Sequence, residues 1–211
     1  VETGPDLVVA LGDVALRATT GAGGVLKQAG RVVRGLHRGR VLISAHPAYV
    51  LRTEGYRKTF ENILSTIPAI LEPAQGEPPI YAKPTPTEMR LLLARLPKTG
   101  HPVAIDIETT GLDPFRGHIT SVAFSQEDRT GFAFDPAWAP YALRAFLRSP
   151  CPKVFHYGQF DTTWLLHHLG VYPRNIIWDT KLAALLEDEN APAGLKILSL
   201  RHTDLGPYDD E

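Results

Sequence analysis

Two acidic residues stand two positions apart in the apolar, β-branched run Val103-Ala104-Ile105-Asp106-Ile107-Glu108. Such a run predicts a β-strand, and side chains on a strand alternate between its faces, so Asp106 and Glu108 share one face. Neighbouring carboxylates repel each other unless a cation lies between them. Carboxylate oxygens are also the ligands that Mg²⁺ and Mn²⁺ prefer, so the pair is a candidate metal site.

A third acid, Asp161, follows Phe160 near the start of a predicted helix. We expect Asp161 to face Asp106 and Glu108, and carboxylates that converge without a cation raise one another's pKa values. Asp179 precedes a further predicted helix and is interpreted first as its N-cap.

The elements that must position these acids lie in the second half of the chain. Strands are predicted over residues 103–108, 118–126, 130–134, 154–156 and 176–178, and helices over 86–96, 137–147, 160–168 and 179–186. The first helix begins with the capping box Thr85-Pro86-Thr87-Glu88. The order of elements predicts an α/β fold with a mixed sheet and flanking helices.

Three segments of this half resemble a known family. The strings AIDIETTGLDP (104–114) and HYGQFDTTWLLHHLGV (156–171) are similar to DEDD 3′–5′ exonucleases of the ribonuclease H-like fold. The string NIIWDTKLAALLEDENAPAGLKILSLRH resembles the proofreading exonuclease of family A DNA polymerases, especially those of phages. The resemblance covers about residues 86–211.

This resemblance implies that Asp106, Glu108 and Asp161 are catalytic and hold two Mg²⁺ or Mn²⁺ ions for phosphodiester hydrolysis, one ion activating water and the other stabilising the leaving oxygen. It also implies that Thr109, Leu112 and Phe160 contact the 3′-terminal nucleotide of single-stranded DNA. Two features depart from the family pattern. Tyr157 stands where the second motif usually opens with asparagine, and no fourth acidic motif is visible before Glu211, so we expect that motif downstream.

His46 is the candidate functional residue of the first half. Strands are predicted at 7–11 and 41–45 and helices at 14–18 and 54–67, and His46-Pro47 directly follows the second strand. Position alone also suits a strand-end histidine that is bonded to the backbone. Between Lys27 and Arg40 five basic residues occur without an acid, a pattern that suits either a solvated face or phosphate contacts.

The strings VVALGDVALRATTG and SAHPAYVLR resemble the C-terminal half of family-four uracil-DNA glycosylases over about residues 5–70. The resemblance implies that His46 stabilises the departing uracil anion and that its loop, which includes Arg52, contacts uracil-containing duplex DNA. Ala48 stands where the family usually has serine. The family's N-terminal motif would precede Val1, so we expect this half to be partial.

A proline-rich stretch separates the halves. Five prolines between Glu72 and Pro86 exclude a helix and disfavour a central strand. We therefore expect a partial glycosylase-like domain at residues 1–71, a linker at 72–84, and a C-terminally incomplete exonuclease-like domain at 85–211. We expect the two domains to have separate cores.

The composition excludes several classes of protein. A single cysteine among 211 residues allows no internal disulfide, and no apolar run reaches the ~20 residues of a membrane span. A reducing cytoplasm, in a bacterial cell or a phage-infected host, is expected. The combined interpretation is a DNA-proofreading exonuclease with a polymerase domain downstream. Two alternatives remain: a base-excision glycosylase whose exonuclease-like half only binds DNA, and a decayed nucleic-acid-binding module.

Overall fold

The computed structural model describes residues 4–36, 39–53, 55–72, 80–189, 191–203 and 205. The chain divides into two compact units, one formed by residues 77–183 and the other by residues up to 76 together with those from 184 onward. The sequence predicted that everything from residue 85 belongs to one domain, whereas the structure groups the last segment with the first unit. Most of the expected linker, residues 73–79, lies outside the described residues.

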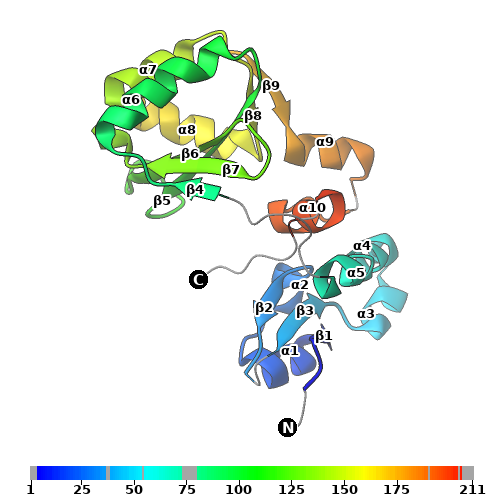
Figure 1. Cartoon of the computed structure of the whole chain (residues 1–211). Helices are drawn as coiled ribbons and strands as arrows, with labels where there is room; N and C mark the ends of the chain where they lie inside the picture. Colours follow the sequence, from blue (N-terminus) through cyan, green and yellow to red (C-terminus); the bar gives the residue numbers. More distant parts are fainter. Residues whose placement is uncertain are drawn as a thin grey trace. The chain divides into compact units, whose positions relative to one another are not determined.

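Over the described residues, the second unit contains a mixed sheet with the strand order β4-β7-β6-β5-β8-β9 (Figure 1). Its strands are β4 (Ile80–Ala82), β5 (Val103–Thr109), β6 (Ile119–Ser125), β7 (Thr130–Phe134), β8 (Lys153–Phe155) and β9 (Ile176–Asp179). Because β5 pairs antiparallel with β6 and parallel with β8, the predicted mixed α/β sheet is confirmed. β4 occupies an edge beside β7 in part of the expected linker, a position that tolerates nearby prolines.

Helices pack on this sheet and hold β5 in place. They are α6 (Pro86–Arg95), the short η1 (Leu96–Lys98) and η2 (Pro136–Trp138), α7 (Pro140–Arg148) and α8 (Gly158–Leu169). The predicted capping box at Thr85 and Glu88 begins α6. Ile105 and Ile107 are buried with side chains of all three longer helices, among them Leu93, Phe146 and Trp164. Each such burial stabilises the fold by ~1.5–3 kcal/mol.

The first unit contains a smaller sheet with the order β1-β3-β2. Its strands are β1 (Leu7–Leu11), β2 (Val32–Arg34) and β3 (Arg40–Ser44), and its helices up to residue 72 are α1 (Asp13–Thr20), α2 (Val25–Gln28), α3 (Pro47–Arg52), α4 (Tyr56–Leu64) and α5 (Ile67–Leu71). The strands β1 and β3 run parallel, so their carboxyl ends meet at one edge.

Two local expectations for this unit differ from the structure. The helix predicted over 54–67 is confirmed by α4 but ends at Leu64, and a separate helix, α5, begins at Ile67, because Pro68 has no N–H to donate to the carbonyl of Leu64. The segment after His46 was expected to be a loop. It forms α3 instead, with Pro47 at the first helical position, where its missing N–H has no cost.

The last two described helices are α9 (Thr180–Glu187) and α10 (Leu195–His202). α10 contributes to the core of the first unit, because Leu200 is 6% exposed and clusters with Leu42, Ile63 and Ile70. Lys58 also forms an ion pair with Asp188 at 3.0 Å in this unit. None of the helices in the described ranges is both long and apolar enough to cross a membrane.

Candidate functional site

The central strand β5 presents Asp106 and Glu108 on one face, as the alternation predicted. Both residues are exposed, whereas Ile105 and Ile107 between and beside them are buried. Across the ladder to β6, Asp106 lies opposite Ala123 and Glu108 lies opposite Ser121. Residues directly opposite each other share a face, so the neighbours of both carboxylates are small and leave room for a ligand.

Asp161 lies in the first turn of α8 and is only 3% exposed. Burial in the first place, and the charge of Asp106 after it, raise the pKa of its carboxyl group to about 7. Its Oδ1 atom is buried and has no hydrogen-bond partner among the described residues. The structure thus brings Asp161 next to the strand acid that the sequence paired with it.

The pKa of Asp106 is also raised. The residue is accessible at its surface, yet partial burial of the carboxyl group raises its pKa, and the charge of Glu108 adds to the increase. Among the described residues, no three His, Cys, Asp or Glu side chains form a group that could hold a metal ion as they stand. The expected convergence of all three acids is therefore incomplete.

The carboxylate oxygens of Asp161 and Asp106 are nevertheless suitable ligands for a divalent cation. Asp161 Oδ1 lacks a partner, and burying a charged carboxylate without one is costly, so the site favours a ligand that supplies positive charge. Asp106 faces it with a second carboxylate whose ionisation is also opposed. A hard cation would relieve both effects, and carboxylate oxygens are its preferred ligands.

Asp179 at the end of β9 has a wider role than the helix cap that the sequence predicted. Its Oδ1 accepts hydrogen bonds from the backbone N–H groups of Lys181 and Leu182 at the start of α9, which confirms the cap. The same carboxylate also accepts from Tyr157 N at 3.0 Å and Gly158 N at 2.7 Å, at the start of α8. Burial opposes its ionisation, but these N–H donors outweigh burial and lower its pKa.

This network holds the turn that leads into Asp161. Tyr157 has a left-handed backbone conformation (φ 59°), and its ring lies 3.8 Å from Lys181 Nζ. At Gly158 an added Cβ would lie 2.7 Å from the Cβ of Phe155, so only glycine fits there. Asp179 can accept hydrogen bonds from the start of α8 because β8, which precedes that helix, is paired in parallel with β9. Sequence periodicity alone does not reveal this pairing.

Two of the predicted substrate-contacting residues, Thr109 and Leu112, lie at the end of β5 and on the loop that follows it. Thr109 donates its hydroxyl to the carbonyl of Gly111 at 2.7 Å, and Leu112 is 88% exposed on the following loop. Phe160, next to Asp161, is half-buried, with its ring centroid 5.9 Å from that of Trp164. Leu112 is therefore available to a ligand, and Phe160 is held partly within the core.

His46 and Arg52 lie in the first unit, and both bind the backbone of Ala48. His46 is the N-cap of α3, and its Nδ1 accepts from Ala48 N at 3.1 Å. Arg52 Nε donates to Ala48 O at 3.0 Å. Within the basic stretch, Arg40 donates to the carbonyl of Ile70, a structural role, and Arg38 lies outside the described residues.

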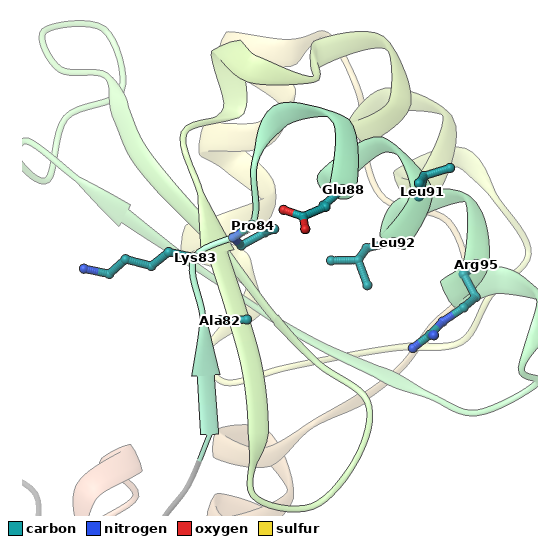
Figure 2. Close-up of a pocket in the computed structure, with 7 residues that line it drawn as sticks. All are labelled: Ala82, Lys83, Pro84, Glu88, Leu91, Leu92 and Arg95. Carbon is teal, nitrogen blue, oxygen red and sulfur yellow. The ribbon is translucent and has the colours of Figure 1, made fainter.

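The second unit also has a pocket that lies away from its carboxylate residues. It is lined from the β4 end by Ala82, Lys83 and Pro84 and from α6 by Glu88, Leu91, Leu92 and Arg95 (Figure 2). In Figure 2 the side chain of Lys83 extends away from the others. Because β7 and β6 separate β4 from β5, this pocket is not part of the carboxylate site.

Comparisons with known proteins agree with the arrangement of the second unit. A family model described as 3′–5′ exonuclease matches residues 83–204, more than half of the chain. The DNA polymerase of Escherichia phage T5 is 32% identical over 121 residues, which cover 52% of this chain and 14% of that protein. The DNA polymerase of Bacillus phage SP01 is 23% identical over 98% of this chain and 26% of its own length.

The chain thus spans about a quarter or less of these curated relatives. Among solved structures, the POL domain of Pol1 from M. smegmatis, in complex with DNA primer-template and dNTP, aligns with a TM-score of 0.51. It is 22% identical and covers 58% of this chain and 22% of its own. At that identity the likeness shows the fold alone.

Proposed function

Because the chain belongs to the 3′–5′ exonuclease family, whose members are nucleases, we propose that it removes nucleotides from the 3′ end of single-stranded DNA. The relationship to two phage DNA polymerases supports a proofreading role, with a polymerase domain elsewhere in a longer protein. We place this activity in the cytoplasm of a bacterial cell or a phage-infected host.

The observation that carries the proposal is the opposition of Asp161 and Asp106. Burial and the charge of Asp106 raise the pKa of Asp161 to about 7, and Asp161 Oδ1 is left without a partner. A structural carboxylate would normally be paired with a cation or with hydrogen-bond donors. A buried carboxyl group with a raised pKa and one unpartnered oxygen, beside a second acid, is typical of a catalytic site.

In this proposal Asp106, Glu108 and Asp161 hold two Mg²⁺ or Mn²⁺ ions. When bound, such ions supply an activated water and neutralise charge that develops on the leaving oxygen. Asp106 and Glu108 would hold such ions at the exposed face of β5, where the ions would offset the negative charge of a bound phosphate. Thr109, Leu112 and Phe160 orient the 3′-terminal nucleotide, and Asp179 keeps the start of α8 in place.

The decisive experiment follows the shortening of a 5′-labelled single-stranded 20-mer on a denaturing gel. We expect a ladder of products with Mg²⁺ or Mn²⁺ and none with EDTA. Asp106→Asn and Asp161→Asn should each reduce the rate by at least about 100-fold. Asp128→Asn is the matched control, because that side chain is 92% exposed and lies on a different loop.

Metal binding is measured separately by thermal denaturation. Mn²⁺ should raise the Tm of the wild-type protein in proportion to its affinity, and Asp161→Asn should lose most of this increase. Digestion that continues in EDTA, or that survives Asp106→Asn, would contradict the proposal. Metal and DNA binding without any cleavage would instead favour the non-catalytic DNA-binding alternative.

A second candidate function, uracil excision, is favoured by one observation in the first unit. His46 Nδ1 accepts a hydrogen bond, so in the neutral ring the proton is on Nε2, and the side chain is exposed at the meeting carboxyl ends of β1 and β3. An Nε2–H donor in that place could stabilise a departing uracil anion. The test is uracil release from duplex DNA, which His46→Ala should reduce far more than DNA binding. No release by the wild-type protein would remove this candidate for the chain.

A further inference from the structure

The loop between β5 and β6 displays an aromatic side chain to solvent. Phe115 is 81% exposed, close to the 88% of Leu112 on the same loop. Single exposed apolar residues are common on protein surfaces and need no explanation by themselves. Phe115 differs because hydrogen bonds within its loop and a hydrogen bond from α8 hold its backbone in place, and the side chain is exposed in that fixed conformation.

Hydrogen bonds within the loop fix its shape. The carboxylate of Asp113 accepts from Phe115 N at 2.9 Å, and its carbonyl accepts from Arg116 N and Gly117 N at 3.1 Å each. Thr110 N donates to His118 O at 3.1 Å, and His118 N donates to Thr110 Oγ1 at 3.0 Å, so the base of the loop is closed.

The loop is also attached to α8. At Gly117 an added Cβ would lie 2.8 Å from Trp164 Cη2, so the backbone packs directly on that ring. His168 Nε2 donates to the carbonyl of Pro114 at 3.1 Å, and the His168 ring stacks on Trp164. A carbonyl can only accept, so Nε2 carries the proton in this contact.

The Phe115 ring itself rests against an exposed histidine. Its centroid lies 4.7 Å from that of His167, and the two planes meet at 65°, an edge-to-face arrangement. This contact supports one part of the ring and leaves most of it open, as the 81% exposure shows. A preorganised, open aromatic face can bind a flat ring with little loss of conformational entropy.

The position of Phe115 relative to the carboxylates suggests its ligand. His167 follows Asp161 by six residues in α8, which corresponds to about 9 Å along the helix axis. Stacked nucleotides rise ~3.4 Å each, so this distance spans two or three nucleotides. A strand whose 3′ end lies at Asp161 can therefore bring an upstream base to Phe115.

We propose that Phe115, supported by His167, is a stacking subsite for a base two to three nucleotides upstream of the 3′ end of the bound strand. The proposal rests on the proposed exonuclease function. Stacking between a base and an aromatic side chain is tolerant of sequence, as a proofreading site requires, because every base has a π-face. The subsite would hold the strand between cleavage events and would add nothing to cleavage itself.

The test compares binding with catalysis in the full chain. In an Asp106→Asn background that prevents digestion, binding of a fluorescent dT₁₀ oligonucleotide is measured by anisotropy. Phe115→Ala should weaken it by about 5- to 150-fold, the equivalent of one lost stacking contact. Phe115→Trp should restore it. Tyr141→Ala is the matched control, because Tyr141 on α7 is 82% exposed, and it should leave binding unchanged.

Two further measurements locate the effect. An abasic site two or three nucleotides from the 3′ end should weaken wild-type binding, and Phe115→Ala should then add little. In the active background, Phe115→Ala should raise KM for dT₁₀ but leave hydrolysis of the p-nitrophenyl ester of thymidine 5′-monophosphate unchanged, because that substrate has no upstream base.

Unchanged dT₁₀ binding by Phe115→Ala would overturn the subsite, and so would equal losses on the oligonucleotide and the ester. Failure of both the wild-type chain and the chain extended to include the expected fourth acidic motif to hydrolyse either substrate with Mg²⁺ or Mn²⁺ would refute the exonuclease function. The anisotropy measurement would still decide the subsite in that case, because it does not depend on cleavage.

Discussion

The carboxylate of Asp179, at the end of β9, accepts a hydrogen bond from the backbone N–H of Gly158, at the start of α8, over 2.7 Å. Twenty-one positions of sequence separate the two residues. The bond secures the first turn of the helix that carries Asp161, so a residue outside the carboxylate pair controls where one member of the pair lies.

Replacing Asp179 should therefore impair both stability and activity. Asp179→Ala leaves the N–H groups of two helix starts without their acceptor and should cost about 1–2 kcal/mol in the free energy of unfolding. We also expect kcat on single-stranded DNA to fall, because Asp161 is no longer held. Asp179→Asn keeps a carbonyl acceptor and should recover much of the loss. Urea denaturation and the gel assay measure the two effects, and full activity of the alanine variant would contradict the positioning role.

The raised pKa of Asp161 predicts a dependence of stability on pH in the absence of metal. The unfolded carboxyl group loses its proton near pH 3.8, and the folded one near pH 7. Between these values the folded state binds more protons at this group, so the contribution of Asp161 to stability is greatest at low pH and falls as the pH rises toward 7. The fall is at most about 4 kcal/mol.

Denaturation midpoints in EDTA between pH 4 and 8 check this slope. The asparagine side chain in Asp161→Asn does not titrate. The stability of this variant should therefore fall less between pH 4 and 7 than that of the wild-type protein. Saturating Mn²⁺ should flatten the wild-type curve near pH 7, because the cation stabilises the ionised form. Wild-type and Asp161→Asn curves of equal slope in EDTA would show that the carboxyl group is not strained.

A buried lysine on β8 should be essential to the second unit. Lys153 is 0% exposed, and its Nζ donates to the carbonyls of Ser149, Cys151 and Arg174 at 2.8–3.0 Å. Lys153→Met keeps the length of the side chain but leaves these acceptors unpaired, at a cost of about 2–5 kcal/mol. Lys98→Met, at an exposed position on η1, should change stability by less than about 0.5 kcal/mol. A tolerated Lys153→Met would show that water replaces the ammonium group.

The grouping of α10 with the first unit predicts which core a C-terminal substitution destabilises. Leu200 is 6% exposed against Leu42, Ile63 and Ile70, so Leu200→Ala should cost about 2–4 kcal/mol. Hydrogen exchange should become faster in β3 and α4 and stay unchanged in β5 and β6. Leu195→Ala, on the same helix at a 46% exposed position, is the control. Faster exchange in β5 instead would restore the domain division that the sequence predicted.

Features that depend on local pattern could be predicted from the sequence alone. Alternation along residues 103–109 places Asp106 and Glu108 on one face, because successive side chains on a strand point to opposite sides. The capping box at Thr85 and the cap at Asp179 follow from short-range hydrogen bonds. The 3′–5′ exonuclease resemblance and the mixed sheet were also accessible, since their motifs are continuous strings of residues.

Contacts between segments that are distant in the sequence could be seen only in the folded structure. It set the opposition of Asp161 to Asp106, the second pair of hydrogen bonds made by Asp179, and the attachment of Phe115 to His167. It also placed Leu200 in the core of the first unit, against the predicted domain division. An amphipathic or apolar pattern indicates that one face of an element is buried. It does not indicate which surface covers that face, because many surfaces offer a similar free energy per unit of buried apolar area. Only the packing of the folded chain selects that surface.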